Sequence, residues 1–148
     1  MSWTKLFGAE LQTKEGLKPT EEVLAGKKYV GIYFSAHWCP PCRRFTPLLA
    51  ESYQQFIDDD LKDLAIVFVS WDEAGDDFDK YYGEMTFDAL PFQNREQKEV
   101  LDQLYEVNSI PTLVFLNESG EIITKGGRVL VENARGNPTL ILGSLAQA

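Results

Sequence analysis

Near-continuous apolar runs, rich in β-branched and aromatic residues, recur along the chain. They occupy residues 29–34, 64–70 and 112–116. Runs of this length and composition are typical of strands covered on both faces of a sheet. Weak alternation over residues 10–19, with a turn at Glu15-Gly16, predicts a short hairpin. Residues 121–124 predict a further strand that pairs back on the third run after the turn 118–120.

Helical spacing separates the predicted strands. Residues 39–57 form the longest such segment, with apolar side chains at Phe45, Leu48, Leu49, Tyr53 and Phe56. Pro40 and Pro41 suit its first turn, and Pro47 should kink it. Shorter helices are expected at 21–25, from Asp76 or Asp77 to about 85, at 96–105 and at 129–133. Thr20 should cap the first of these helices, and Gly26 should stop it. In the 96–105 helix, Val100, Leu101 and Leu104 share one face. Residues 140–142 are too short to assign.

This order of elements predicts an α/β fold in which a central mixed sheet is flanked by helices on both faces. A length of 148 residues suits one domain, 1–148, and the composition of 44% hydrophobic and 25% charged residues is that of a globular protein. No apolar run reaches the roughly 18 residues that a membrane span needs, and the N-terminus shows no secretory pattern. We therefore expect a soluble protein.

The net charge is -9 and the pI about 4.6. Nucleic acids and anionic membranes attract clustered Lys and Arg, so neither is an expected partner. The acidic surface is either a plain solvated surface or a field that favours cationic partners. No repetitive apolar stripe suggests an oligomer interface, so we expect a monomer.

The only cysteines, Cys39 and Cys42, lie three residues apart where a predicted strand gives way to a helix. A helix N-terminus stabilises a thiolate, which is the form that attacks disulfides. We expect Cys39, exposed at the helix end, to attack, and Cys42, more buried one turn in, to resolve the mixed disulfide. Structural zinc would need two more ligands, and His37 is the only histidine, so no metal is expected. A single redox pair suits a reducing compartment.

Two further motifs indicate a binding site around Cys39. Ile110-Pro111-Thr112 precedes a predicted strand, and a cis peptide there would leave the Ile110 backbone free to pair with an extended substrate. Trp71-Asp72-Glu73 follows another strand, at the sheet edge where α/β proteins place their sites. Trp71 could form a wall of the site, or the two acids could be a solvated turn.

These motifs together resemble the tryparedoxin–nucleoredoxin branch of the thioredoxin superfamily, over residues 20 to 130. The resemblance implies a thioredoxin-like fold with Pro111 cis and a cytoplasmic electron carrier whose only redox group is the Cys39–Cys42 disulfide, with no other cofactor. It implies reduction by trypanothione or a similar thiol, and transfer to peroxiredoxin-type and glutathione-peroxidase-type peroxidases, hence hydroperoxide detoxification. The substrate-contact residues implied are Trp38, Pro40, Pro41, Trp71, Glu73, Ile110, Pro111 and Arg128.

Two alternatives remain. The protein could be a nucleoredoxin-like or generic thioredoxin that uses another reductant, or a binding module that the Cys pair switches. Thioredoxins carry a buried acid six residues before the first Cys, and that position is Tyr33 here. The proton of Cys42 would then go to a water, to Tyr33 as a hydrogen-bond partner, or to a carboxylate such as Asp72.

Overall fold

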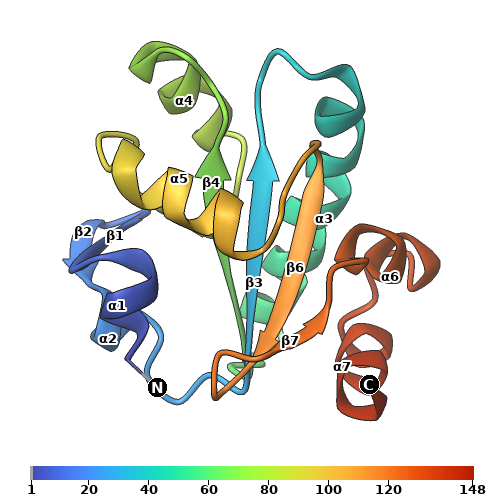
Figure 1. The fold of residues 1–148 in the computed structure, drawn as a ribbon. Coiled ribbons are helices and arrows are strands. Elements are labelled where there is room, and N and C mark those ends of the chain that lie inside the picture. The colour runs from blue at the N-terminus through green and yellow to red at the C-terminus, as the bar shows by residue number, and fades with distance from the viewer. Residues whose placement is uncertain (1) are drawn as a thin grey trace.

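A seven-stranded mixed sheet forms the centre of the protein in the computed structural model, which describes residues 2–148 (Figure 1). The strands are β1 (Glu10–Thr13), β2 (Gly16–Pro19), β3 (Tyr29–Ser35), β4 (Leu64–Ser70), β5 (Asp88–Ala89), β6 (Thr112–Asn117) and β7 (Ile122–Thr124). Their order is β2-β1-β5-β4-β3-β6-β7. β3 runs parallel to β4 and antiparallel to β6, so the mixed sheet expected from the sequence is confirmed.

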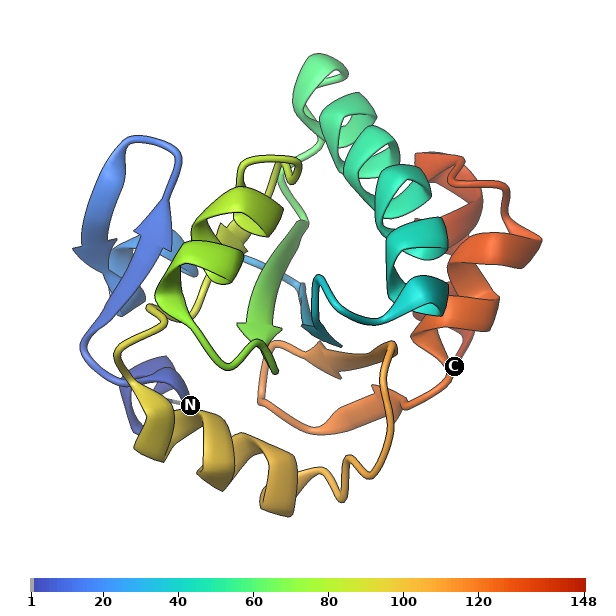
Figure 2. The ribbon, with the colours of Figure 1, turned by 90° about the horizontal axis from the view of Figure 1, so that it is seen from above.

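Helices cover both faces of this sheet (Figure 2). They are α1 (Trp3–Phe7), α2 (Thr20–Val23), α3 (Pro40–Asp58), α4 (Gly75–Tyr82), α5 (Arg95–Leu104), α6 (Gly127–Asn133) and α7 (Pro138–Gln147). One core lies between the sheet and α3, α4, α6 and α7, and the other lies between the sheet and α1, α2 and α5. None of these helices is both long and apolar enough to span a bilayer.

The two cores explain why the central strands read as continuous apolar runs. In β3, Tyr33 faces the first core while Ile32 and Phe34 face the second. In β4 every residue is buried, and successive side chains alternate between the two cores. A strand covered on both faces has no polar side, so its pattern shows no alternation of apolar and polar residues.

Two expected helix caps are wrong. Thr20 is the first residue of α2, and its hydroxyl donates to the carbonyl of Gly8 (2.7 Å) instead of capping the helix. Asp76 and Asp77 lie inside the first turn of α4, because the chain enters that helix at Gly75. Carboxylates in a first turn still stabilise the helix through its dipole.

The buried face of α5 also differs from the expected one. Leu101 is buried, but Val100 and Leu104 are 48% and 55% exposed. The face that meets the sheet instead carries Lys98 and Asp102, whose side chains are only 16% and 11% exposed. Apolar spacing alone therefore predicted the helix correctly and its orientation only in part.

The C-terminal residues form α7, which the sequence pattern did not assign. Its N-cap is Asn137, whose side chain accepts a hydrogen bond from the Leu140 amide (3.1 Å). The turn before it is held to α3, because the Ser52 hydroxyl donates to the Gly136 carbonyl (2.7 Å). Residues 127–147 thus complete the first core.

Candidate active site

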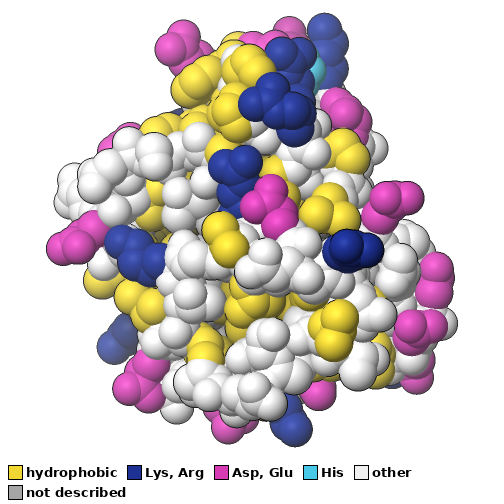
Figure 3. Space-filling view, turned by 90° about the vertical axis from the view of Figure 1, so that its right-hand side faces the viewer, with side chains coloured by type: hydrophobic (Ala, Val, Ile, Leu, Met, Phe, Trp, Pro, Cys, Tyr) yellow, Lys and Arg dark blue, Asp and Glu magenta, His cyan; other side chains and the backbone are white. Residues whose placement is uncertain are grey.

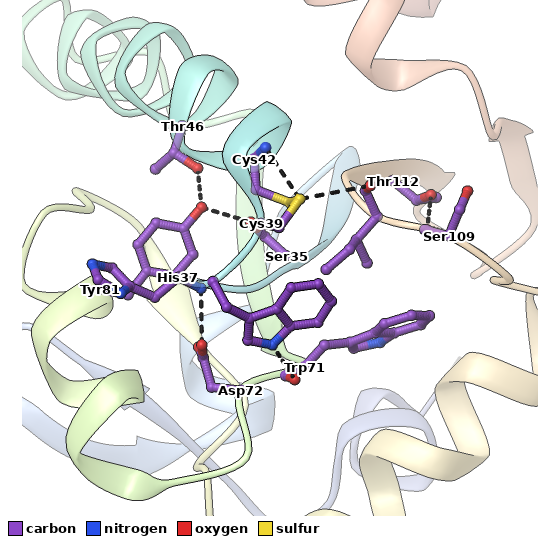
Figure 4. The surroundings of a disulfide bond; sticks show 12 residues. Ser35, His37, Cys39, Cys42, Thr46, Trp71, Asp72, Tyr81, Ser109 and Thr112 are labelled. Carbon is purple, nitrogen blue, oxygen red and sulfur yellow. Dashed lines mark hydrogen bonds between the residues drawn. A yellow bond between two sulfur atoms is a disulfide. The ribbon is translucent and has the colours of Figure 1, made fainter.

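Three segments that are far apart in the sequence meet at one edge of the sheet. β3 and β4 are parallel and pair Ser35 with Ser70, so their carboxyl ends lie side by side. β6 is antiparallel to β3 and starts at Thr112, opposite Phe34. The loops that carry the Cys pair, Trp71 and Pro111 therefore converge at this edge (Figure 4).

Cys39 and Cys42 form a disulfide at the N-terminus of α3, with their Cα atoms 5.2 Å apart. Cys39 is the N-cap residue, and its Sγ accepts a hydrogen bond from the Cys42 amide (3.3 Å). The two residues are 4% and 0% exposed. The expected order of exposure therefore holds, but Cys39 is far less open than expected because the surrounding loops pack around it.

The segment before β6 lies against the disulfide. The Ile110–Pro111 peptide bond is cis. The Ile110 carbonyl oxygen lies 3.8 Å from the Cys39 Sγ, and the Ile110 side chain packs on the cluster of Ala36, Cys39 and Cys42. A backbone edge is thus placed directly beside Cys39.

Two tryptophans form one side of the site. Trp71 packs against the Cys pair, and its carbonyl accepts a hydrogen bond from the Trp38 indole N–H (3.2 Å). The Trp38 ring is largely exposed and lines, with Glu73 and Asp77, an open hollow of about 440 Å³. Aromatic and carboxylate groups in one hollow favour a cationic group.

Asp72 is buried, so the solvated-turn interpretation is wrong for this residue. Its carboxylate accepts hydrogen bonds from the His37 amide (2.8 Å) and the Ser70 hydroxyl (2.8 Å). Asp72 thereby ties the loop that enters the Cys motif to the end of β4. Glu73 is exposed, as a solvated turn requires.

A buried hydroxyl cluster, which sequence reasoning did not foresee, lies beneath the Cys pair. It consists of Tyr33, Ser35, Thr46 and Tyr81. The Thr46 hydroxyl bonds to those of Tyr33 (2.6 Å) and Tyr81 (2.5 Å), and Tyr81 also bonds to Ser35 (2.6 Å). Burial raises the pKa of Tyr33 and of Tyr81 above the usual phenol value. The sequence signal that could have indicated this cluster is the position of Thr46, one helical turn after Cys42.

The remaining predicted residues are Pro40, Pro41 and Arg128. Pro40 is exposed and Pro41 half-buried in the first turn of α3. Arg128 lies in α6, where its guanidinium pairs with Glu132 (3.5 Å). Its neighbour Gly127 packs on Leu113, near the start of β6, and Figure 3 shows both basic and acidic side chains on the side of the molecule that carries α6. Within residues 2–148, no cluster of three or more His, Cys, Asp or Glu side chains could hold a metal ion.

A disulfide at a helix N-terminus, beside a cis proline and at the carboxyl ends of parallel strands, defines the class of thioredoxin-fold thiol–disulfide oxidoreductases. Residues 26–122 match the family described as thioredoxin-like. The chain belongs to this family, in the branch that contains tryparedoxins and nucleoredoxins.

Relatives of both kinds support this placement. A tryparedoxin from Trypanosoma brucei brucei is 47% identical over 105 residues, which cover 70% of this chain and 72% of that protein. A nucleoredoxin from Bos taurus is 41% identical over 142 residues, or 83% of this chain but 32% of that protein. The chain thus spans about a third of the length of the nucleoredoxins that it matches.

Solved structures agree with the fold. A tryparedoxin II complexed with glutathionylspermidine superposes with a TM-score of 0.80 at 39% identity, covering 89% of this chain and 92% of that one. A thioredoxin from Wuchereria bancrofti superposes with a TM-score of 0.76 at 40% identity, covering 97% and 98%.

Proposed function

We propose that the protein is a dithiol–disulfide oxidoreductase that carries two electrons through Cys39 and Cys42. The observation that carries this proposal is the N-cap position of Cys39, whose Sγ accepts the Cys42 amide hydrogen at the start of a 19-residue helix. This hydrogen bond and the positive helix end favour a thiolate on Cys39, and so a low thiol pKa.

The proposed cycle has two halves. In the reducing half, a thiolate of a small dithiol attacks the Cys39 Sγ, and Cys42 leaves as a thiolate. The second thiolate of the reductant then closes its own disulfide and releases Cys39 as a thiolate. In the oxidising half, Cys39 attacks an acceptor disulfide and expels one acceptor thiolate, and Cys42 attacks the Cys39 Sγ and expels the other. The Cys39–Cys42 disulfide is the only redox group that this cycle requires, so we propose no metal or other cofactor.

Substrate contacts follow from the surroundings of Cys39. An extended substrate segment can pair with the Ile110 carbonyl at the cis Pro111, beside the attacked sulfur. Trp71 forms the wall on the other side, while Trp38 and the exposed Pro40 form the rim. Pro41, half-buried in the first turn of α3, is proposed as a further contact beside it.

For the reductant we propose trypanothione or a similar cationic thiol. The hollow beside Trp38 carries two carboxylates, of Glu73 and Asp77, and a polyamine would neutralise them. A similar tryparedoxin II has been solved with glutathionylspermidine, which supports this choice. Arg128 is proposed to meet an anionic part of the thiol substrate, since only its Nε contacts Glu132 and its terminal N–H groups can donate elsewhere.

The proposed acceptors are peroxiredoxin-type and glutathione-peroxidase-type peroxidases. We also propose that the protein acts as a monomer in the cytoplasm, without nucleic-acid or membrane partners. The confinement of cysteine to one redox pair supports a reducing compartment, and the net charge of -9 supports the absence of nucleic-acid and membrane partners.

A second candidate is a nucleoredoxin-like or thioredoxin-like carrier that takes electrons from another donor. Two similarities favour it. The match to the Bos taurus nucleoredoxin extends over 142 residues, and that to the Wuchereria bancrofti thioredoxin covers nearly the whole chain. The Cys39 chemistry is the same in both candidates.

Stopped-flow reduction of the oxidised protein distinguishes the two, with tryptophan fluorescence as the signal because Trp71 touches the Cys pair. The reductants are trypanothione, glutathione, and thioredoxin with its reductase. Fast reduction by trypanothione alone supports the first candidate. Fast reduction by another donor with slow trypanothione overturns it in favour of the second. No reduction by any of the three would contradict both and favour a redox-switched binding module. Cys39→Ser is the control that must abolish every reaction.

A further inference from the structure

The sheet-facing side of α5 carries an ion pair where an amphipathic helix usually carries apolar side chains. The Lys98 Nζ lies 2.8 Å from the Asp102 Oδ2, and both side chains are mostly buried. Partial burial of two charges costs desolvation free energy, so the pair needs further contacts to be retained. Those further contacts are made with a residue of the candidate active site, Trp71.

Both members of the pair contact the Trp71 indole. The indole N–H of Trp71 donates to the Asp102 Oδ1 (3.0 Å). The Lys98 ammonium lies 4.9 Å from the centroid of the same ring, within the range of a cation–π interaction. The indole therefore has one hydrogen-bond acceptor at its edge and one cation over its ring.

The same helix also holds the backbone that leads into Trp71. The Arg95 guanidinium donates to the Ser70 carbonyl (2.9 Å), at the last residue of β4. Trp71 in turn packs against Cys39 and Cys42. Contacts thus run from α5 through one side chain to the disulfide.

We propose that Asp102 and Lys98 are positioning residues that fix the Trp71 indole beside the Cys pair. An indole without its acceptor is free to rotate about its side-chain torsions, so the wall of the site is present only part of the time. Substrate then binds less tightly, while the helix N-terminus that activates Cys39 is unchanged. The proposal rests on the proposed function, since it assigns these residues to substrate binding for disulfide exchange.

Three variants separate the contacts. Asp102→Ala removes both the acceptor and the ion pair. Asp102→Asn keeps an oxygen for the Trp71 N–H but loses the charge, and Lys98→Met removes the ammonium while keeping the side-chain stem. Asp58→Ala is the matched control, because Asp58 accepts a side-chain hydrogen bond from Gln54 across one turn of α3, at the exposed far end of that helix.

The first readout is the set of indole N–H signals in a ¹⁵N–¹H spectrum, where Trp71→Phe assigns the Trp71 signal. We expect Asp102→Ala to shift or broaden that signal, Asp102→Asn to do so less, and Asp58→Ala to leave it in place. An unchanged Trp71 signal in Asp102→Ala would overturn the proposal.

The second readout is the reduction of insulin disulfides with dithiothreitol as the electron source. Loss of one hydrogen bond predicts a KM about threefold to tenfold higher for Asp102→Ala, with kcat within about twofold and recovery in Asp102→Asn. A fall in thermal stability with KM unchanged would mean a purely structural role and would also overturn it. Failure of the wild-type protein to reduce insulin would count against the proposed function, and the indole signals would still decide the positioning of Trp71.

Discussion

Replacement of Thr46 by valine tests the buried hydroxyl cluster beneath the Cys pair. The substitution keeps the shape of the side chain and removes its hydroxyl, which lies 2.6 Å from the Tyr33 oxygen and 2.5 Å from the Tyr81 oxygen. Tyr81 retains Ser35 as a partner (2.6 Å), whereas Tyr33 loses the partner that lies closest to it. Burial raises the pKa of both phenols, so both remain protonated at neutral pH and need an acceptor.

The expected loss follows from these contacts. A neutral hydrogen bond contributes about 1 kcal/mol net, and a buried polar group left without a partner costs about 1–3 kcal/mol. With Tyr81 still satisfied, Thr46→Val should lower the free energy of unfolding by about 2 kcal/mol. In a chain of this length that corresponds to a fall in Tm of about 4–8 °C.

Urea unfolding of the oxidised protein measures this loss, with Tyr33→Phe and the double variant Thr46→Val/Tyr33→Phe for comparison. Removing both partners leaves no buried phenol unsatisfied, so the double variant should be less destabilised than the sum of the single variants. A change below about 0.5 kcal/mol in Thr46→Val, or strictly additive effects, would refute the view that these hydroxyls form one network.

Three other predictions concern the chemistry, the pH dependence and the packing. Cys42→Ser should accumulate a mixed disulfide between Cys39 and its substrate, because the resolving thiolate is missing; mass spectrometry of the intact adduct checks this. Burial raises the pKa of Asp88 to about 6. The contribution of this residue to the free energy of unfolding is therefore fully present below about pH 4 and is lost as the pH rises through 6. Asp88→Asn should therefore make the urea midpoint less dependent on pH between pH 4 and 7 and stabilise the protein at pH 7 by about 3 kcal/mol, and an unchanged pH profile would contradict the assignment. Gly127→Ala would place a Cβ 2.6 Å from the Leu113 carbonyl oxygen and should lower stability by about 1–3 kcal/mol, whereas Gly143→Ala, with open space around it in α7, should raise Tm.

The sheet was predictable because its central strands are buried on both faces. The run at residues 64–70 coincides with β4, and the run at 29–34 falls one residue short of the end of β3. The Cys pair and Pro111 were also predictable, since a helix start and a strand start fix where their backbones lie. Their convergence follows from the parallel pairing of β3 with β4 and the antiparallel pairing of β3 with β6.

The elements and orientations that the sequence did not predict depend on tertiary contacts. β5 has only two residues and is defined by its neighbours β1 and β4. α1 is a five-residue helix whose apolar side chains Trp3, Leu6 and Phe7 are buried against the second core. The orientation of α5 was missed because hydrophobic spacing assigns charged residues to solvent, whereas Lys98 and Asp102 face inward toward Trp71.

The residue six positions before Cys39 bears on which group accepts the proton of Cys42, a choice that the sequence left open. Tyr33 occupies it, and the raised pKa of this buried phenol means that it remains protonated at neutral pH. Tyr33 can donate a hydrogen bond there but cannot take the proton of Cys42. The group that accepts the proton of Cys42 is therefore expected to lie outside the hydroxyl cluster. Asp72 is one carboxylate outside this cluster: it is buried and accepts hydrogen bonds from the His37 amide and the Ser70 hydroxyl. We therefore expect the proton of Cys42 to go to a water or to a carboxylate such as Asp72.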